Sequence, residues 1–321
     1  MLAGGASVQF RPSRSMPETQ DPIMKFTPES ARLRMVELIA SQVREEGITE
    51  TALPGVELMH STHAMARTPV IYQPGISVLV QGRKRCYLGD QAFTYDQHNY
   101  LVNSVPIPVE AETEASPEVP LFGVKIKVEL GGLAEMLLEM DDRLPEPTTS
   151  PRGLYATPLD ETLSSTVIRL LECLAKPVDA RILGPLIVRE LIYRVLCGEQ
   201  GGALRALATR HSHCGRIGKV LRHVHANFSQ PLDIETMADE ASMSVSAFHH
   251  HFKAVTSSSP LQYVKTIRLH QARILMVQEG CNAGIAAQRV GYESPSQFSR
   301  EFKRLFGANP SAEAARVRSA L

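Results

Sequence analysis

The sequence lacks the paired cysteines that organise a small metal site or a disulfide framework. Five cysteines are present, and they stand far apart without any C-x-x-C pair: Cys86, Cys173, Cys197, Cys214 and Cys281. This spacing argues against a zinc ribbon and against a disulfide-stabilised scaffold. We therefore expect buried or unreactive thiols in a reducing compartment.

Long apolar runs are also missing. No run reaches the ~18 apolar residues that a membrane-spanning helix requires. Residues 1–20 lack the apolar core flanked by basic residues that is typical of a signal peptide. We therefore expect a cytoplasmic protein. A chain of 321 residues with 43% hydrophobic residues is long enough for two domains with cores of their own.

Several enzyme motifs are absent as well. No G-x-S-x-G elbow occurs, and the Gly201-Gly202 pair is not followed by the Gly-Lys-Ser/Thr of a phosphate-binding loop. His60 and His63 lie in a strand-rich stretch. However, the third histidine and the carboxylate that a metal-dependent cupin enzyme needs do not accompany them. The sequence thus argues against these classes of enzyme.

Two groups of histidines do not meet the requirements of a metal site. His211, His213 and Cys214 lack a fourth ligand at a typical spacing. The three histidines at 249–251 are consecutive in a predicted helix, so their side chains point in different directions. We expect neither a metal nor another cofactor.

No net charge distinguishes the chain as a whole, because 34 Lys+Arg balance 34 Asp+Glu. The two kinds of charge are unevenly distributed along the chain. Residues 1–208 hold 20 basic and 26 acidic side chains, whereas residues 209–321 hold 14 basic and 8 acidic ones and eight of the eleven histidines. A basic carboxyl-terminal part beside an acidic amino-terminal part indicates that only the former meets a polyanion.

The amino-terminal part is predicted to be rich in short strands. Residues 1–26 have no apolar period and predict a disordered tail, and a helix is predicted from Thr27-Pro28 to Gly47. Short β-type runs follow, separated by turn residues that include Pro106 and Pro108. The predicted strands are 70–72, 76–80, 84–88, 92–95, 100–105 and 121–128. This pattern favours a small barrel or sandwich, whose interior either encloses one small ligand or is filled by side chains.

Three further helices are predicted before the second domain, at 133–140, 159–174 and 180–196. The last two carry full apolar stripes, which either cover the barrel or pair with the same helices of another chain. Residues 198–202 predict a flexible joint. The predicted organisation is a regulatory and dimerisation domain at 27–202 with helices at 159–197, a linker at 203–215 and a helical domain at 216–321.

The helical domain contains the same local pattern twice, at an offset of about fifty residues. The matching positions are Ala238, Phe248, Phe252, Lys253 and Pro260 in the first unit and Ala287, Phe298, Phe302, Lys303 and Pro310 in the second. Each unit predicts a short helix, a tight turn, a serine cap and a second helix. This is the helix-turn-helix layout, whose second helix commonly enters the DNA major groove.

The helical period selects the residues that would face DNA. If the paired Phe side chains are buried, polar side chains occupy the opposite face of each second helix. The predicted DNA-binding residues are Ser244, Ser246, Ala247, His249, His250 and Lys253 in the first unit and Ser294, Ser296, Gln297, Ser299, Arg300, Lys303 and Arg304 in the second. Arg can bond a guanine edge, Gln an adenine edge, and Ser or Lys a phosphate. The second unit is therefore the better equipped for base recognition.

The stretch between the units, 260–278, predicts a rigid spacer. It contains no internal Pro or Gly and carries apolar side chains on more than one side. A helix of that length spans roughly 28 Å, close to the ~34 Å that separates successive major grooves. We expect the two units to bury this helix from both sides.

The second unit contains Ala287-Gln288-Arg289-Val290-Gly291-Tyr292, the run from Gln297 to Gly307, and Pro310. These residues closely resemble the signature of the AraC/XylS family of bacterial transcription regulators. The first unit and Arg268-Leu269 are similar to the same family. A more diffuse similarity links 80–84 and 87–90 to its arabinose-binding-type regulatory domain. The resemblance implies an α+β two-domain protein: a cupin-like β-barrel with flanking helices, and an all-α, seven-helix domain with two helix-turn-helix units.

The resemblance also implies a function and partners. Such a regulator binds promoter DNA, forms a homodimer, contacts RNA polymerase and responds to a small-molecule effector or partner at its amino-terminal domain. The run Arg83-Lys84-Arg85 is a candidate polyanion or anionic-effector site, with Arg83 and Arg85 as the effector-binding candidates, and a solvated strand end is the alternative. His250 stands where many members carry Arg, so we assign the first unit to positioning on DNA and the second to sequence recognition.

The competing function is enzymatic. A cupin-type enzyme or a DNA-alkylation repair protein could be fused to the same helical domain. Repair by alkyl transfer would require an activated cysteine in an electropositive setting, and no cysteine here has a recognisable motif.

Overall fold

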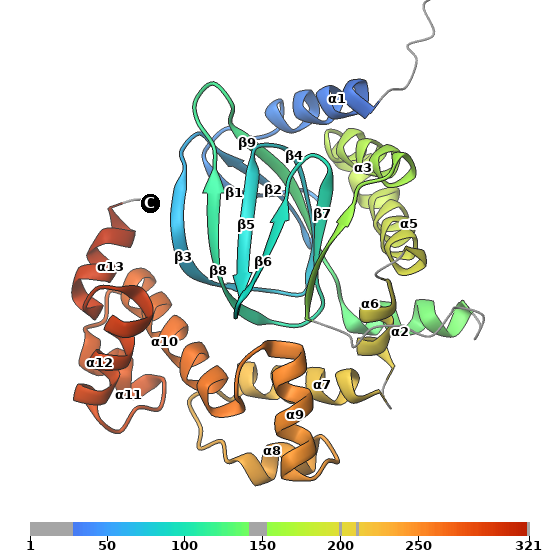
Figure 1. Ribbon diagram of the computed structural model, residues 1–321. Helices are drawn as coiled ribbons and strands as arrows, with labels where there is room; N and C mark the ends of the chain where they lie inside the picture. The colour runs from blue at the N-terminus through green and yellow to red at the C-terminus, as the bar shows by residue number, and fades with distance from the viewer. Residues whose placement is uncertain (1–27, 141–152, 199–200, 210–211, 320–321) are drawn as a thin grey trace, which may run out of the picture.

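The computed structural model describes residues 28–140, 153–198, 201–209 and 212–319. The predicted tail at 1–26 lies outside these residues. The described chain forms an amino-terminal part with two β-sheets and flanking helices and a carboxyl-terminal part made of helices (Figure 1). The predicted α+β fold is therefore confirmed. Within the described ranges, no helix is long and apolar enough to cross a membrane.

The amino-terminal part begins with α1 (Pro28–Ala40) and continues with a long series of strands. These strands are β1 (Gly47–Glu50), β2 (Val56–Ser61), β3 (Met65–Tyr72), β4 (Gly75–Gln81), β5 (Arg83–Leu88), β6 (Gln91–Tyr95), β7 (Asn99–Asn103), β8 (Ile107–Glu114) and β9 (Leu121–Lys127). The elements that follow are α2 (Leu130–Glu139), β10 (Leu154–Pro158), α3 (Glu161–Leu174), α4 (Pro177–Ile182), α5 (Gly184–Cys197) and α6 (Gly201–Ala208).

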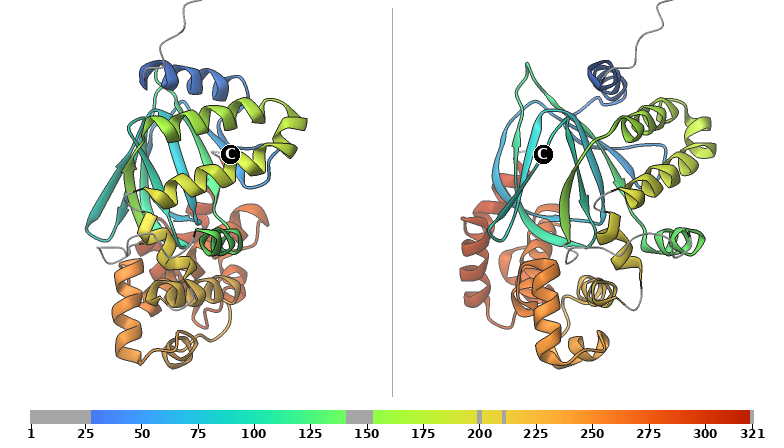
Figure 2. Two further views of the ribbon diagram at one scale, coloured as in Figure 1. Left: turned by 90° about the vertical axis from the view of Figure 1, so that its right-hand side faces the viewer. Right: turned by 45° about the vertical axis from the view of Figure 1, so that its right-hand side comes forward.

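The strands form two antiparallel sheets that curve around a common interior (Figure 2). One sheet has six strands in the order β1-β2-β9-β4-β7-β10, and the other has four in the order β3-β8-β5-β6. Helices α1, α3 and α5 cover the outer face of the larger sheet (Figures 1 and 2). Strand β4 is apolar almost throughout because Ile76 and Val78 pack under the helices while Leu79 points into the interior.

The six strands predicted from the sequence are present, but β1, β2, β8 and β10 were not predicted. The turn predicted at Pro106 and Pro108 is wrong at its second residue, because Pro108 lies inside β8 and pairs with Ile71 of β3. A proline fits there for a physical reason. Strand β8 lies between β3 and β5, but β5 pairs with it only from Glu110 onward. Pro108 therefore has no strand partner on the β5 side, where its missing N–H costs no inter-strand hydrogen bond.

The predicted helices are present with shifted ends. The first helix ends at Ala40 rather than Gly47, and Gly47 instead adopts a φ of +106° and begins β1. The helix predicted at 180–196 is two helices, α4 and α5, since Pro185 at the start of α5 lacks the N–H that would continue the preceding helix. Residues 199 and 200 of the predicted joint at 198–202 lie outside the described residues, and α6 begins at Gly201 and also occupies part of the expected linker at 203–215.

Helices make up the rest of the described chain. They are α7 (His213–Ala226), α8 (Ile234–Glu240), α9 (Val245–Thr256), α10 (Pro260–Gln278), α11 (Ala283–Arg289), α12 (Pro295–Phe306) and α13 (Pro310–Arg318). Helices α8 and α9 form the first repeated unit, and α11 and α12 form the second. The long helix α10 joins them (Figure 1).

Candidate nucleic-acid interface

The two repeated units have the same local construction. Ser244 caps α9 by accepting a hydrogen bond from the Ala247 N–H at 3.3 Å, and Ser294 caps α12 by accepting one from the Gln297 N–H at 3.2 Å. Each cap satisfies an N–H that the helix itself leaves free. The hydroxyls of Ser244 and Ser294 thus fix the starts of the two second helices.

The tight turn before each second helix requires a left-handed residue. Ser242 has a φ of +52° in the first unit, and Gly291 has a φ of +83° in the second. A Cβ at Gly291 would lie 2.5 Å from the Ser229 carbonyl oxygen, so glycine is needed there for space as well as for backbone conformation. These turns set the angle at which α9 and α12 leave the preceding helices.

Helix α9 presents the face that the sequence predicts. Phe248, Phe252 and Val255 are buried in the core of the first unit. The opposite face exposes Ser246, His249, His250 and Lys253, whereas Ala247 is half-buried at its edge. The Lys253 ammonium makes no hydrogen bond or ion pair within the described part of the chain and is therefore available to an anionic partner.

Helix α12 presents a more basic face. Phe298 and Phe302 are buried, and the side chains exposed on the other side are those of Ser296, Ser299, Arg300, Lys303 and Arg304. None of the three cations forms a hydrogen bond or ion pair with the residues that the structure describes. Gln297 is half-buried, and its amide nitrogen donates to the Glu301 carboxylate at 3.1 Å.

Helix α10 packs into both units, as the sequence predicts. Its first half contributes Tyr263, Val264 and Ile267 to the core of the first unit, and its second half contributes Leu269 and Met276 to the core of the second. Its 19 residues correspond to roughly 28 Å. The two second helices are thereby attached near opposite ends of one rigid element.

Arg268 in the middle of α10 fastens this arrangement. Its guanidinium donates to the carbonyl oxygens of Phe228 at 2.7 Å, Gly291 at 3.0 Å and Gln230 at 2.9 Å. The first and third carbonyls belong to the connection between α7 and α8, and the second belongs to the turn before α12. One side chain therefore ties both units to the helix between them. Sequence reasoning noted Arg268 only as part of the family signature.

The chain resembles known regulators over both parts. The family model of the AraC-type transcriptional regulator N-terminus matches residues 52–203, and a helix-turn-helix domain model matches residues 237–316. The virulence regulon transcriptional activator VirF of Yersinia enterocolitica is 24% identical over 74% of this chain and 88% of its own length. The two models together match most of the chain, in the order of the two parts of the fold.

The chain belongs to the AraC family of transcription regulators. The HTH-type transcriptional regulator AlkR of Acinetobacter baylyi is 34% identical, but the match spans only 29% of this chain and 31% of AlkR. Crystal structures of ToxT from Vibrio cholerae share the fold. One at 1.65 Å resolution has a TM-score of 0.54 at 11% identity, covering 80% of this chain and 97% of ToxT. Another, with unsaturated fatty acid bound, has a TM-score of 0.51 at 12% identity, covering 85% and 97%.

The curated relatives are named as regulators, and two buried thiols of this AraC-family chain, Cys86 and Cys214, do not suit the competing repair chemistry. Burial raises the pKa of Cys86 to about 12 and that of Cys214 to about 11, so both thiols stay protonated at neutral pH. Alkyl transfer needs the thiolate. In the residues described, no group of three or more His, Cys, Asp or Glu side chains could hold a metal ion.

The AraC-type amino-terminal domain packs directly on the first helix-turn-helix unit. Leu101, Val105 and Ile107 of the barrel share one hydrophobic cluster with Phe252 and Tyr263 of the helical part. The Gly153 N–H donates to the Val255 carbonyl oxygen at 3.2 Å. A Cβ added at Gly153 would lie only 2.7 Å from that oxygen, so a larger residue would not fit there. The barrel therefore holds the carboxyl-terminal end of α9 in close contact.

A buried hydrogen-bond chain crosses this junction. The Tyr263 hydroxyl donates to the Pro106 carbonyl at 2.6 Å and lies 2.9 Å from His225 Nε2. Because a carbonyl can only accept, the Tyr263 hydroxyl uses its proton in the bond to Pro106. His225 must therefore donate its Nε2–H to the Tyr263 hydroxyl oxygen. Burial lowers the pKa of His225 to about 4, so the imidazole is neutral at neutral pH.

Arg83 and Arg85, the predicted effector candidates, lie on the outer face of the smaller sheet. Arg85 pairs with Glu112 at 3.1 Å and with Glu114 at 2.9 Å, and Arg83 lies 3.5 Å from Glu114. Lys84, between them in β5, points the opposite way because side chains alternate along a strand. Its cross-strand neighbours Tyr95 and Thr113 are buried. The sequence placed Lys84 among the effector candidates only as the middle residue of the run Arg83-Lys84-Arg85.

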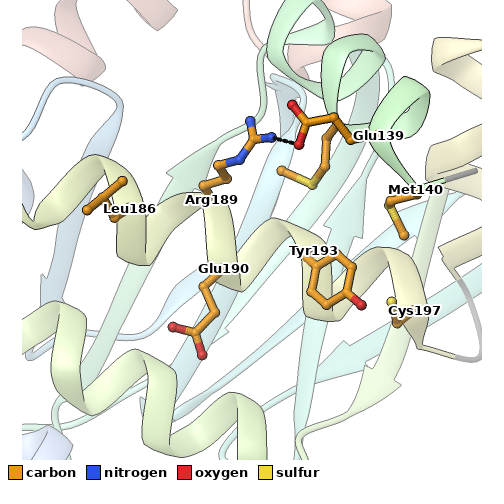
Figure 3. Close-up of a pocket in the computed structure, with 8 residues that line it drawn as sticks. Glu139, Met140, Leu186, Arg189, Glu190, Tyr193 and Cys197 are labelled. Atoms are coloured by element: carbon orange, nitrogen blue, oxygen red, sulfur yellow. Dashed lines mark hydrogen bonds and ion pairs between the residues drawn. The ribbon is translucent and has the colours of Figure 1, made fainter.

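The apolar stripes of the flanking helices are buried within the chain to different extents. Leu163, Val167 and Leu170 of α3 are buried within the chain. On α5, by contrast, Leu186 is 63% and Tyr193 48% exposed. They line a groove of about 570 Å³ between α5 and α2, in which Arg189 pairs with Glu139 at 2.6 Å (Figure 3).

Proposed function

We propose that α12 supplies base recognition at promoter DNA and that α9 chiefly supplies contacts to phosphate. The observation that carries this proposal is the face of α12, where Arg300, Lys303 and Arg304 are exposed and free of ion pairs within the described residues. A guanidinium can bond a guanine edge in two places, whereas a lysine ammonium is a point charge suited to phosphate. On α9 the exposed face holds one lysine and two histidines in place of arginines.

Selection of bound sequences from a pool of random duplexes tests this proposal. The expected result is an enriched site with two recognised segments whose centres lie about one helical turn apart, roughly 10 bp, because α10 holds the two units at that spacing. The segment bound by α12 should be the more sharply defined. Recovery of unselected sequence would overturn the proposal.

We further propose that the amino-terminal domain controls DNA binding through the junction at Tyr263 and Val255. A change in the barrel that shifts the loop at Pro106 would move α10 and the end of α9 together, since both are bonded to the barrel. In this proposal, contact with RNA polymerase is made by the DNA-bound form.

We propose that the effector is an apolar acid recognised by Lys84. Burial lowers the pKa of Lys84, and the nearby ammonium of Lys125 lowers it further. Lys125 has Glu57 as a partner at 3.0 Å, whereas Lys84 makes no hydrogen bond or ion pair with the described residues. A cation taken from water without a partner is costly, and a carboxylate would relieve that cost. The fatty-acid-bound structure of ToxT, which has the same fold, supports this class of ligand.

Thermal unfolding with straight-chain fatty acids tests the effector proposal, with the corresponding neutral amides as controls. The acids should raise the melting temperature of the full chain and the amides should not, because only the acids carry the compensating charge. Lys84→Met should abolish the difference. An equal shift with acids and amides, or an undiminished shift in Lys84→Met, contradicts the proposal.

We propose a homodimer formed through α4 and α5. The support is a row of exposed apolar side chains on that surface: Val178, Ile182, Leu183, Leu186 and Tyr193. Sedimentation of the full chain should give a dimer at micromolar concentration, and Leu186→Glu should give a monomer. Leu33→Glu changes another exposed leucine, on α1, and is the matched control, which should remain dimeric. A monomeric wild-type chain rules the interface out.

A further inference from the structure

The Glu301 carboxylate lies on α12 and is engaged from three directions. Oε1 accepts from Lys265 Nζ at 2.8 Å and from Gln297 Nε2 at 3.1 Å, and Oε2 accepts from the Tyr292 hydroxyl at 2.7 Å. The side chain is 13% exposed. Lys265 comes from α10 and Tyr292 from the turn before α12, so Glu301 joins three elements beside the exposed basic face.

Glu301 is held in its ionised form. Burial raises its pKa, but the hydrogen bonds from Lys265, Tyr292 and Gln297 together outweigh that effect and bring the pKa below its usual range. An ionised carboxylate has no proton to donate and can only accept hydrogen bonds. The neighbouring groups of Glu301 are therefore forced to present donors to it.

This requirement fixes the orientation of the Gln297 amide. The oxygen and nitrogen of a glutamine can exchange places by a half-turn of the terminal amide, but only the nitrogen can satisfy Glu301. The amide nitrogen carries two hydrogens, one on the same side as the amide oxygen and one on the opposite side. Because the amide oxygen and the Glu301 carboxylate repel each other, the hydrogen on the opposite side is the one donated to Glu301. The other edge of the amide then carries the oxygen and the second N–H side by side.

An oxygen acceptor beside an N–H donor is the pattern that matches adenine in the major groove. The oxygen accepts from the N6 amino group while the N–H donates to N7. The reversed amide would not present this pair in the same place. Gln297 is the third residue of α12 and lies in its first turn, at the amino-terminal end that commonly reaches base edges in helix-turn-helix proteins.

We propose that Glu301 is a positioning residue that holds Gln297 ready to read adenine. This inference rests on the proposed entry of α12 into the major groove. Glu301 itself touches no base; it acts by excluding one of the two orientations of the Gln297 amide. The bonds from Lys265 and Tyr292 keep the carboxylate in place while the amide engages DNA.

The test compares sequence preference, position by position, for the full chain and three variants. In Gln297→Ala, the adenine preference at one position should fall by about tenfold or more, since a bidentate pair is lost. In Glu301→Gln, the new amide can donate to Gln297 and permit the reversed orientation, so the same position should lose its preference for adenine. Glu279→Gln, an exposed carboxylate paired with Arg289, is the control and should leave every position unchanged.

Each other outcome overturns the inference. If Gln297→Ala leaves all positions intact, Gln297 reads no base. If only Gln297→Ala has an effect, Glu301 does not orient it. A uniform loss of affinity in Glu301→Gln, with preferences intact, assigns Glu301 a structural role only. Should that variant not fold, Glu301→Asp is used instead. It keeps the negative charge, but its shorter side chain moves the carboxylate away from Gln297, so the adenine preference should again be lost. A wild-type chain without any sequence preference would instead refute the proposed function.

Discussion

At the scale of single residues, Arg300 is the side chain on which we expect base recognition by α12 to depend most. It is exposed and makes no hydrogen bond or ion pair within the described residues. Arg300→Ala should weaken binding to the selected site by ~1 to 3 kcal/mol and relax the preference at one base pair, because a bidentate contact to guanine is lost. Binding titrations with the selected site and with each single-base variant measure both effects.

The control for Arg300 is Arg44→Ala, which removes the same charge from an exposed position between α1 and β1 of the regulatory domain. This variant should bind the selected site as the wild type does. If Arg300→Ala weakens binding to selected and random DNA equally, Arg300 holds phosphate and reads no base.

Lys253 should behave differently from Arg300. Its ammonium lies on the exposed face of α9, where we expect a phosphate contact. Lys253→Ala should lower affinity for all sequences alike and reduce the slope of log K against log salt concentration by about one, since one fewer counterion is displaced. Affinities measured over a series of salt concentrations give that slope. An unchanged slope would remove Lys253 from the contacts.

The exposed faces of α9 and α12 could be predicted because buried Phe residues fix the phase of a helix. Phe248 and Phe298 together with the 3.6-residue period place Lys253 and Arg300 outside, and the structure has them exposed. The bond between Glu301 and Lys265 could not be predicted in this way. It joins residues 36 positions apart, and only the packing of α12 on α10 brings them together.

At the scale of elements, strand β8 was missed although its sequence alternates between apolar and polar residues. In β8, Ile107, Val109 and Ala111 point inward and alternate with outward polar residues or proline, which is the ordinary pattern of a half-buried strand. Because proline is common in turns, Pro106 and Pro108 led to the prediction of a turn in place of this strand. The break between α4 and α5 was missed for the opposite reason, because their apolar period continues across Pro185.

Helix α10 gives a prediction at this scale, because one of its side chains fastens it to the barrel. Tyr263→Phe removes the hydroxyl that bonds the Pro106 carbonyl and His225. Both of these buried groups then lack a partner, so the free energy of unfolding should fall by ~1 to 3 kcal/mol. Denaturant unfolding of the full chain measures the change.

The matched control for Tyr263 is Tyr87→Phe. Its hydroxyl donates to Glu112 at 2.8 Å on the outer face of the sheet, where Arg85 still pairs with the carboxylate after the change. The loss of stability should be clearly smaller than for Tyr263→Phe. Equal losses would mean that the hydrogen bonds at the junction contribute no more than one at the surface.

At the scale of the whole molecule, the barrel and the first helix-turn-helix unit share a core. The hydrophobic cluster that contains Leu101 and Ile107 also contains Phe248 and Phe252, whereas the second unit has a cluster of its own around Phe302. The sequence predicts the apolar faces on each side but not that they meet. The first unit should therefore respond to changes in the barrel more directly than the second.

Two buried histidines at or near this junction predict how the stability of the whole chain depends on pH. Burial lowers the pKa of His225 to about 4, and burial, reinforced by Arg273, lowers that of His270 to about 3. In the unfolded chain a histidine titrates near 6.5. Between these values the unfolded state binds more protons than the folded state, so the free energy of unfolding should fall as the pH drops from about 6.5 towards 4.

The contribution of His225 can be isolated by substitution. His225→Gln keeps an N–H donor for the Tyr263 hydroxyl but does not titrate, so its unfolding free energy should lose less on acidification than that of the wild type. The difference at pH 4.5 should be on the order of 1 to 3 kcal/mol, from about 1.4 kcal/mol per unit of pKa difference. Denaturant unfolding at pH 7.5, 6.0 and 4.5 measures it.

His98→Gln, at an exposed site, is the control and should keep the wild-type pH dependence. If His225→Gln also keeps it, His225 is not held neutral in the folded chain, and acid does not act on the junction through this residue.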